Sequence, residues 1–184
     1  MNLDALGGPP LLETERFRLR ALVPEDADAL LQVFGDEEAM RFYDRGVILE
    51  LGEARVLIAT LNKRREDRLG IRWAIAAKSD GAVVGTIGYN AFVASADRAT
   101  LGYDVARAHW GKGVATEAVR AAVAWGHATL GLHRIEAVVM IGNERSTNVL
   151  RKAGFREEGL LRGYGRWKAA YHDLRMFSHL PPDP

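Results

Sequence analysis

In the first third of the chain, the spacing of apolar residues changes from every second residue, typical of a strand, to every third or fourth residue, typical of a helix. Apolar residues alternate with arginines over residues 16–22, which predicts a half-buried strand. Pro24 suits the first turn of a helix, and Gly35 suits its end. Between them, the helical spacing is kept by Ala27, Leu30, Leu31 and Phe34. The same spacing predicts a second helix at Ala54, Leu57, Ile58 and Leu61.

The middle of the chain predicts three strands followed by a helix. The strands are expected over residues 71–77, 82–90 and 98–106, and Ser-Asp-Gly at residues 79–81 marks the turn between the first two. A long stripe then follows helical spacing: Ala115, Ala118, Val119, Ala122, Val123 and Gly126. Because these residues are small, this helix is expected to lie close to the sheet.

The last third predicts strand, helix, strand and strand. A strongly apolar strand is expected over residues 134–141, a short helix between Asn143 and Gly154, and two strands over residues 155–161 and 170–177. The order β-α-α-β-β-β-α-β-α-β-β indicates an α+β fold, with a mostly antiparallel, seven-stranded mixed sheet flanked by helices. Residues 11–180 are expected to form a single domain. Residues 1–10 and 181–184 are rich in Gly and Pro and are predicted to be loose tails.

Composition and charge exclude several classes of protein. Lys and Arg total 25 and Asp and Glu total 24, so no overall field attracts nucleic acid or a membrane surface. Neither a signal peptide nor the roughly 20 apolar residues of a membrane helix can be found. The chain has no cysteine, and its five histidines lack a ligand spacing, so no metal site is expected. These features predict a cytoplasmic protein with no nucleic-acid or membrane partner.

One segment combines glycines with the start of a helix. Residues 109–117 read His-Trp-Gly-Lys-Gly-Val-Ala-Thr-Glu and join a predicted strand to a predicted helix. Glycines let the backbone approach a ligand closely, and the N–H groups of a helix start favour an anion. A plain helix start is one interpretation. A dinucleotide site is a second, but it needs a third glycine where Thr116 stands. A coenzyme A site is the third.

Two signatures lie one predicted strand apart. The first is Trp-Gly-Lys-Gly-x-Ala at residues 110–115, and the second has the form Asn-x-x-Ser-x-x-(apolar)-x-x-Lys-x-Gly-Phe over residues 143–155. Together they resemble the GNAT (Gcn5-related N-acetyltransferase) superfamily, in the branch that includes the Rim-type acetylases of ribosomal-protein N-termini. Trp110 departs from the Gln or Arg that is usual in the loop. The resemblance implies the GNAT acyl-CoA N-acyltransferase fold.

The resemblance also implies acetyl-CoA as the acyl donor, bound where two central strands splay apart. The backbone near Val105 would bind the pantetheine arm, the loop would bind the pyrophosphate, and Asn143 would touch the arm from the other side or serve as a plain helix cap. The implied cofactor-binding residues are Val105, Trp110, Gly111, Lys112, Gly113, Val114, Ala115, Asn143 and Lys152.

The usual catalytic groups of the superfamily are missing. Many relatives place a Glu where Thr100 stands and a Tyr where Leu150 stands. Alternation along the strand puts Asp104 on the same face as Thr100, so Asp104 is a candidate base, directly or through a water, or a structural carboxylate. Ser146 is a candidate hydroxyl beside the departing sulfur, or a first-turn helix serine.

These features predict an N-acetyltransferase that moves an acetyl group from acetyl-CoA to a primary amine by direct attack in a ternary complex. A protein N-terminal amine is one candidate acceptor, and a homodimer through the last strands is a family-level expectation. The alternative is a sensor of the same fold that binds acyl-CoA without catalysis.

Overall fold

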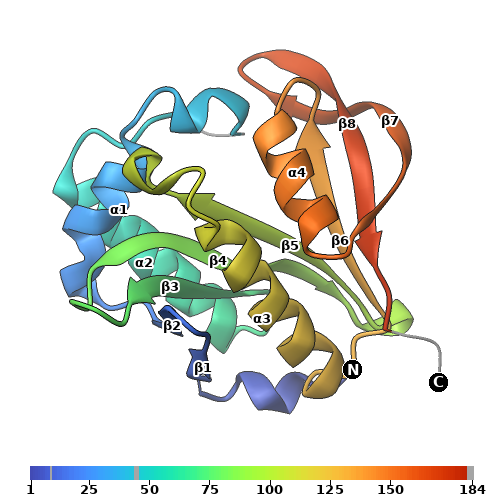
Figure 1. Cartoon of the computed structure of the whole chain (residues 1–184), viewed down its shortest axis with the longest axis horizontal. Helices are drawn as coiled ribbons and strands as arrows, with labels where there is room; N and C mark the ends of the chain where they lie inside the picture. Colours follow the sequence, from blue (N-terminus) through green and yellow to red (C-terminus); the bar gives the residue numbers. More distant parts are fainter. Residues whose placement is uncertain (9, 44–45, 182–184) are drawn as a thin grey trace.

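A computed structural model describes residues 1–8, 10–43 and 46–181 and contains one eight-stranded sheet with helices on both faces (Figure 1). The strand order is β1-β2-β3-β4-β5-β6-β8-β7. The strands are β1 (Leu12–Glu13), β2 (Phe17–Ala21), β3 (Ile71–Ala77), β4 (Val83–Val93), β5 (Arg98–Val105), β6 (Arg134–Met140), β7 (Arg156–Trp167) and β8 (Ala170–His179). The helices are α1 (Ala27–Phe34), α2 (Leu51–Glu66), α3 (Val114–Ala128) and α4 (Glu144–Lys152). The fold class and the element order are as predicted, apart from one added strand.

The added strand is β1, which pairs antiparallel with β2 through only two residues. Two residues are too few for alternation to be visible in the sequence. Within the described ranges, none of the helices combines the length and apolarity needed to cross a bilayer.

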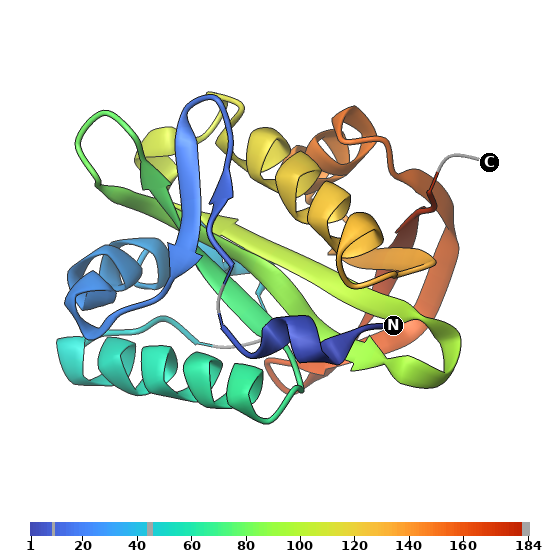
Figure 2. The same cartoon turned by 90° about the horizontal axis from the view of Figure 1, so that it is seen from below.

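Neighbouring strands of the sheet run antiparallel everywhere except at β5 and β6, which run parallel. Antiparallel pairs join β1 through β5, and antiparallel pairs join β6, β8 and β7. The pair β5–β6 is parallel because α3 returns the chain across the sheet (Figure 2). Its register covers only three pairs, from Arg98 with Arg134 to Thr100 with Glu136. Beyond these pairs the two strands separate.

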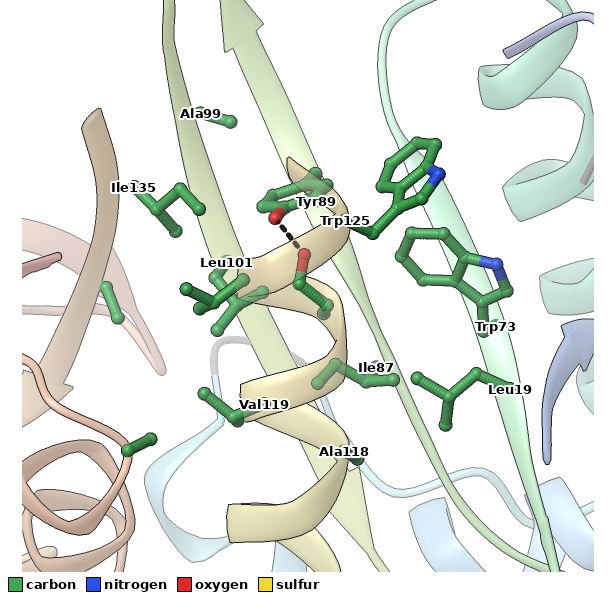
Figure 3. Close-up of a cluster of buried hydrophobic side chains, with 14 of the residues drawn as sticks. Leu19, Trp73, Ile87, Tyr89, Ala99, Leu101, Ala118, Val119, Trp125 and Ile135 are labelled. Carbon is green, nitrogen blue, oxygen red and sulfur yellow. Dashed lines mark hydrogen bonds between the residues drawn. The ribbon is translucent and has the colours of Figure 1, made fainter. Parts of the chain in front are cut away.

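Each face of the sheet has its own apolar cluster. Trp73 and Ile75 of β3 belong to the cluster that packs against α3 and α4, whereas Ala74 belongs to the cluster under α1 and α2. Figure 3 shows the first cluster, in which the Tyr89 hydroxyl donates to the carbonyl oxygen of Ala122 at 2.7 Å. Alternation along the strands therefore decides which side chains face which pair of helices.

The prediction of a loose tail over residues 1–10 is wrong for the described part of that segment. Residues Leu3–Leu6 form a 3₁₀ helix, and Leu6 is 1% exposed within the main cluster. The Asn2 backbone N–H donates to the Leu130 carbonyl oxygen at 2.7 Å, which ties the segment to the turn that follows α3. The four apolar residues Met1, Leu3, Ala5 and Leu6 stand before a Gly-Gly-Pro-Pro run and are too few to show a clear period, so this packing could not be predicted from the sequence. Residues 182–184 of the predicted C-terminal tail lie outside the described residues.

The last hairpin is longer than the sequence predicts. β7 runs on to residue 167 and β8 to residue 179, and Lys168 and Ala169 form the turn with φ of 50° and 61°. The ammonium of Lys168 donates to the carbonyl oxygens of Met40 and Arg41 at 3.2 and 3.3 Å. The hairpin tip thus contacts the connection between α1 and α2, as Figure 1 also shows. Irregular register near Gly159 and Gly165 obscures the alternation in the sequence.

Candidate active site

A cleft of about 1010 Å³ opens where β5 and β6 separate. Its walls come from β5 (residues 100–105), β6 (residues 137–140), the loop before α3, and α4. Residues of both faces of β5 line it, because Thr100, Gly102 and Asp104 alternate with Leu101, Tyr103 and Val105. The cleft therefore passes through the sheet from one face to the other.

The loop before α3 has the backbone geometry of an anion site. Gly111 and Gly113 have φ of +73° and +77°, the left-handed region that glycine adopts without strain. Gly113 is the N-cap of α3 and has no side chain to occupy the free N–H groups of the first turn. Gly111, Gly113, Val114 and Ala115 line the cleft. These N–H groups and the helix dipole favour a phosphate at this end of the cleft.

Lys112 does not share this placement. It is exposed, and it is absent from the residues that line the cleft. Its carbonyl oxygen accepts a hydrogen bond from the Arg16 guanidinium at 3.0 Å. The contribution of Lys112 that the structure shows is therefore to hold the loop through its backbone.

Glu117 holds the same loop from inside the first turn of α3. Its carboxylate accepts from the Thr14 hydroxyl at 2.6 Å and from the Arg16 backbone N–H and Nε, both at 2.8 Å. Partial burial raises the pKa of Glu117, but the hydrogen bonds from Thr14 and Arg16 outweigh it and hold the pKa below its usual value. Glu117 therefore stabilises the loop as a carboxylate that holds Arg16, which in turn bonds the loop at Lys112.

Trp110 replaces the usual polar residue of the loop and joins the two walls of the cleft. Its Nε1 donates to the Val105 carbonyl oxygen at 2.7 Å. The Arg145 guanidinium of α4 lies 4.5 Å from the centre of the Trp110 ring, a cation–π contact. The Val105 carbonyl oxygen, which was expected to contact the pantetheine arm, thus already accepts one hydrogen bond. Because a carbonyl oxygen has two lone pairs, it can accept a second bond from the arm.

α4 starts beside the opposite wall. The Asn143 side chain accepts from the Ser146 backbone N–H at 3.2 Å, so Asn143 caps α4 and also lines the cleft. The Ser146 hydroxyl lies 2.7 Å from the Tyr103 hydroxyl. Lys152 lines the cleft at the far end of α4, and its carbonyl oxygen accepts from Arg120 at 2.6 Å.

Asp104 lies on the face of the sheet that α1 and α2 cover, paired with a buried arginine. Its carboxylate accepts from the Arg72 guanidinium, with side chains 12% and 5% exposed. Arg72 also donates to Thr86 Oγ1 at 3.0 Å, to Asn90 Oδ1 at 3.1 Å and to the Gly102 carbonyl oxygen at 3.2 Å. Each of these two buried side chains thus has an opposite charge beside it.

Residues 16–156 match the protein family described as Acetyltransferase (GNAT) domain. This chain belongs to the GNAT acetyltransferase family. YoaA of Bacillus subtilis (strain 168), described as an uncharacterized N-acetyltransferase, is 35% identical over 173 residues, covering 94% of this chain and 98% of YoaA.

Two further similarities concern ribosomal-protein acetylation and coenzyme A. The [Ribosomal protein uS5]-alanine N-acetyltransferase of Escherichia coli (strain K12) is 38% identical over 72 residues, which cover 37% of each chain. The structure of Mycobacterium smegmatis RimJ in complex with CoA-disulfide superposes with a TM-score of 0.84 and 25% identity, covering 95% of this chain and 88% of RimJ.

In this GNAT domain the two positions where the resemblance leads one to expect a Glu and a Tyr differ in their surroundings. Thr100 lines the cleft at the last β5–β6 pair. Leu150, at the Tyr position, is 0% exposed and belongs to the main apolar cluster, although the cleft reaches it. An apolar side chain there completes the packing of α4 against the sheet.

The sequence analysis of this GNAT domain missed Arg72 and gave Tyr103 no specific role. Arg72 is a lone charge inside the apolar strand β3 (Ile-Arg-Trp-Ala-Ile-Ala-Ala), and a buried charge demands a partner. That demand could have drawn attention to Asp104 as its pair. Among the described residues, no group of three or more His, Cys, Asp or Glu side chains is placed to hold a metal ion.

Proposed function

We propose that this protein transfers an acetyl group from acetyl-CoA to a primary amine by direct attack within a ternary complex. The observation that carries the proposal is the cleft through the sheet. It joins a glycine loop at a helix N-terminus, suited to a pyrophosphate, to the polar groups beside Asp104 on the other face. A donor and an acceptor can therefore meet between β5 and β6. The CoA-disulfide in the structure of RimJ, which superposes on this chain, supports a CoA donor.

The expected donor contacts are those of the loop and of α4. The backbone N–H groups of Gly111, Gly113, Val114 and Ala115 would bind the pyrophosphate. Trp110 would fix the shape of the loop through Val105. Asn143 and Lys152 line the opposite wall of the cleft and would flank the pantetheine arm there.

The reaction needs a neutral amine and a stabilised leaving group. The amine nitrogen attacks the thioester carbon, the C–S bond breaks with its electron pair going to sulfur, and the amine gives up one proton. Asp104 is the proposed acceptor of that proton, directly or through one water. Asp104, which is paired with Arg72, also places a carboxylate near an arriving ammonium group, which must lose one further proton to solvent before its nitrogen can attack. The Ser146 hydroxyl is the proposed hydrogen-bond donor to the departing sulfur.

We propose a protein N-terminal amine as the first acceptor class to test, with the reaction in the cytoplasm. The similarity to the uS5-alanine acetyltransferase supports this choice, although it spans only 37% of the chain. Polyamines, aminoglycosides and free amino acids are the competing acceptors in the test.

The experiment incubates the purified protein with acetyl-CoA and a panel of amines while free thiol is measured. Thiol release that depends on one amine class, with the acetylated amine found by mass spectrometry, is the expected result. Tight CoA binding without thiol release above the no-enzyme rate for any amine would favour the non-catalytic sensor instead. CoA at a hundredfold excess over Kd should stabilise the fold by about 2.7 kcal/mol. A larger thermal shift with NADH than with CoA would overturn the proposed donor.

A further inference from the structure

Tyr103 reaches from β5 across the cleft to α4. Alternation places its side chain on the face of the sheet that carries α3 and α4, beside the buried Leu101 and Val105. The last residue of β5 in register with β6 is Thr100, so Tyr103 lies where the strands have already separated. Its ring packs against the main apolar cluster, and the residue also lines the cleft.

Both recorded partners of the Tyr103 hydroxyl belong to Ser146. The phenol oxygen lies 2.7 Å from Ser146 Oγ and 3.1 Å from the Ser146 carbonyl oxygen. Ser146 itself is fixed by its backbone N–H bond to the Asn143 cap. A hydroxyl has one proton and can accept as well as donate. The direction of the Tyr103 proton therefore decides whether the Ser146 proton points back to Tyr103 or into the cleft.

We propose that Tyr103 is a positioning residue that donates to Ser146 Oγ and so turns the Ser146 proton toward the departing sulfur. This inference rests on the proposed acetyl transfer. The Ser146 hydrogen bond would then stabilise the thiolate as the C–S bond breaks, while the Tyr103 proton stays on its oxygen. A hydroxyl held in the required orientation before the reaction needs no reorganisation when charge develops.

The surroundings of Tyr103 suit a group that keeps its proton. Burial raises the pKa of Tyr103, its hydrogen bond with the Ser146 side chain lowers it, and the charge of Asp104 raises it, so the net direction is upward. The phenol is therefore neutral throughout the neutral range and can act as a permanent donor. The superfamily's usual Tyr position is taken by Leu150, so β5 supplies a phenol where α4 has none.

The test compares Tyr103→Phe, Ser146→Ala and the double variant by steady-state kinetics with acetyl-CoA and the acceptor that the panel identifies. Tyr103→Phe removes one oxygen and keeps the ring that packs in the cluster. We expect its kcat to fall about tenfold or more, with KM and Kd for acetyl-CoA unchanged. The double variant should be no slower than Ser146→Ala, because Tyr103 acts only through Ser146.

Tyr89→Phe is the matched control. Its hydroxyl is also buried and donates to a backbone carbonyl, that of Ala122, but the residue does not line the cleft. It should lower Tm and leave kcat unchanged. Wild-type kcat in Tyr103→Phe, or additive losses in the double variant, would overturn the role of Tyr103. A wild-type protein that acetylates no amine would instead remove the proposed function, and this inference with it.

Discussion

Replacing Arg72 by methionine tests how much the buried ion pair contributes to stability. Methionine keeps most of the side-chain length but removes every donor to Asp104, Thr86, Asn90 and the Gly102 carbonyl. Removing one partner of a buried pair costs about 3–5 kcal/mol. Asp104 borders the cleft, where water can reach it, so the expected loss is at the low end, about 3 kcal/mol. For a chain of this size that loss lowers Tm by about 6–12 °C.

Urea denaturation and calorimetry at neutral pH measure this loss. The double variant Arg72→Met/Asp104→Asn should be more stable than Arg72→Met, because the carboxylate that lost its guanidinium is then neutral. Arg18→Met is the matched control, since Arg18 pairs with Glu13 at 3.2 Å while both side chains are half exposed. Such a surface pair contributes about 0–1 kcal/mol. The reasoning is refuted if Arg72→Met loses no more stability than Arg18→Met.

Three further outcomes are expected. Gly113→Val should abolish CoA binding by calorimetric titration without unfolding the chain, because its side chain would stand where the backbone must approach the pyrophosphate. Gly131→Val has a similar φ, +65° against +77°, but lies outside the cleft and should bind CoA normally. Normal binding by Gly113→Val would make the loop a plain helix start. Asp104→Asn should lower kcat/KM by about 10²–10⁴ in the thiol assay, and an unchanged value at every pH would remove Asp104 from the mechanism. Burial, and then the charge of His127, lower the pKa of His179, so the unfolded chain binds the proton more readily than the folded one. The free energy of unfolding should therefore fall as pH drops below the unfolded pKa of about 6.5. His179→Gln should flatten that pH dependence in urea titrations, and an unchanged slope would count against a role for His179.

Much of the fold could be predicted because its elements follow regular periods. β3 occupies residues 71–77, as its largely apolar sequence before the Ser-Asp-Gly turn indicated, and α3 buries Ala118, Val119 and Ala122 along the expected stripe. The cap at Asn143 was also predicted, and the structure confirms it through the bond from the Ser146 amide. Such signals are local, so the sequence carries them without knowledge of the tertiary structure.

The parts that failed depend on distant contacts. Leu6 is buried because α3 and α2 lie beside it, and β7 extends past residue 161 because β8 pairs with it. The pairing of Arg72 with Asp104 joins residues 32 positions apart, and the Tyr103–Ser146 contact joins residues 43 apart. Candidate residues could be chosen from motifs, but their partners come from the sheet register and the docking of α4.

An opening through a sheet has two mouths, and this has a consequence for inhibitor design. The glycine loop lies at one mouth of the cleft, and the polar network of Arg72 lies at the other. A compound that joins an amine acceptor to the sulfur of CoA would thread the sheet and bind at both mouths at once. Linking the two ends raises the effective concentration of each at its own mouth to the millimolar range, so the conjugate should bind far more tightly than either half alone.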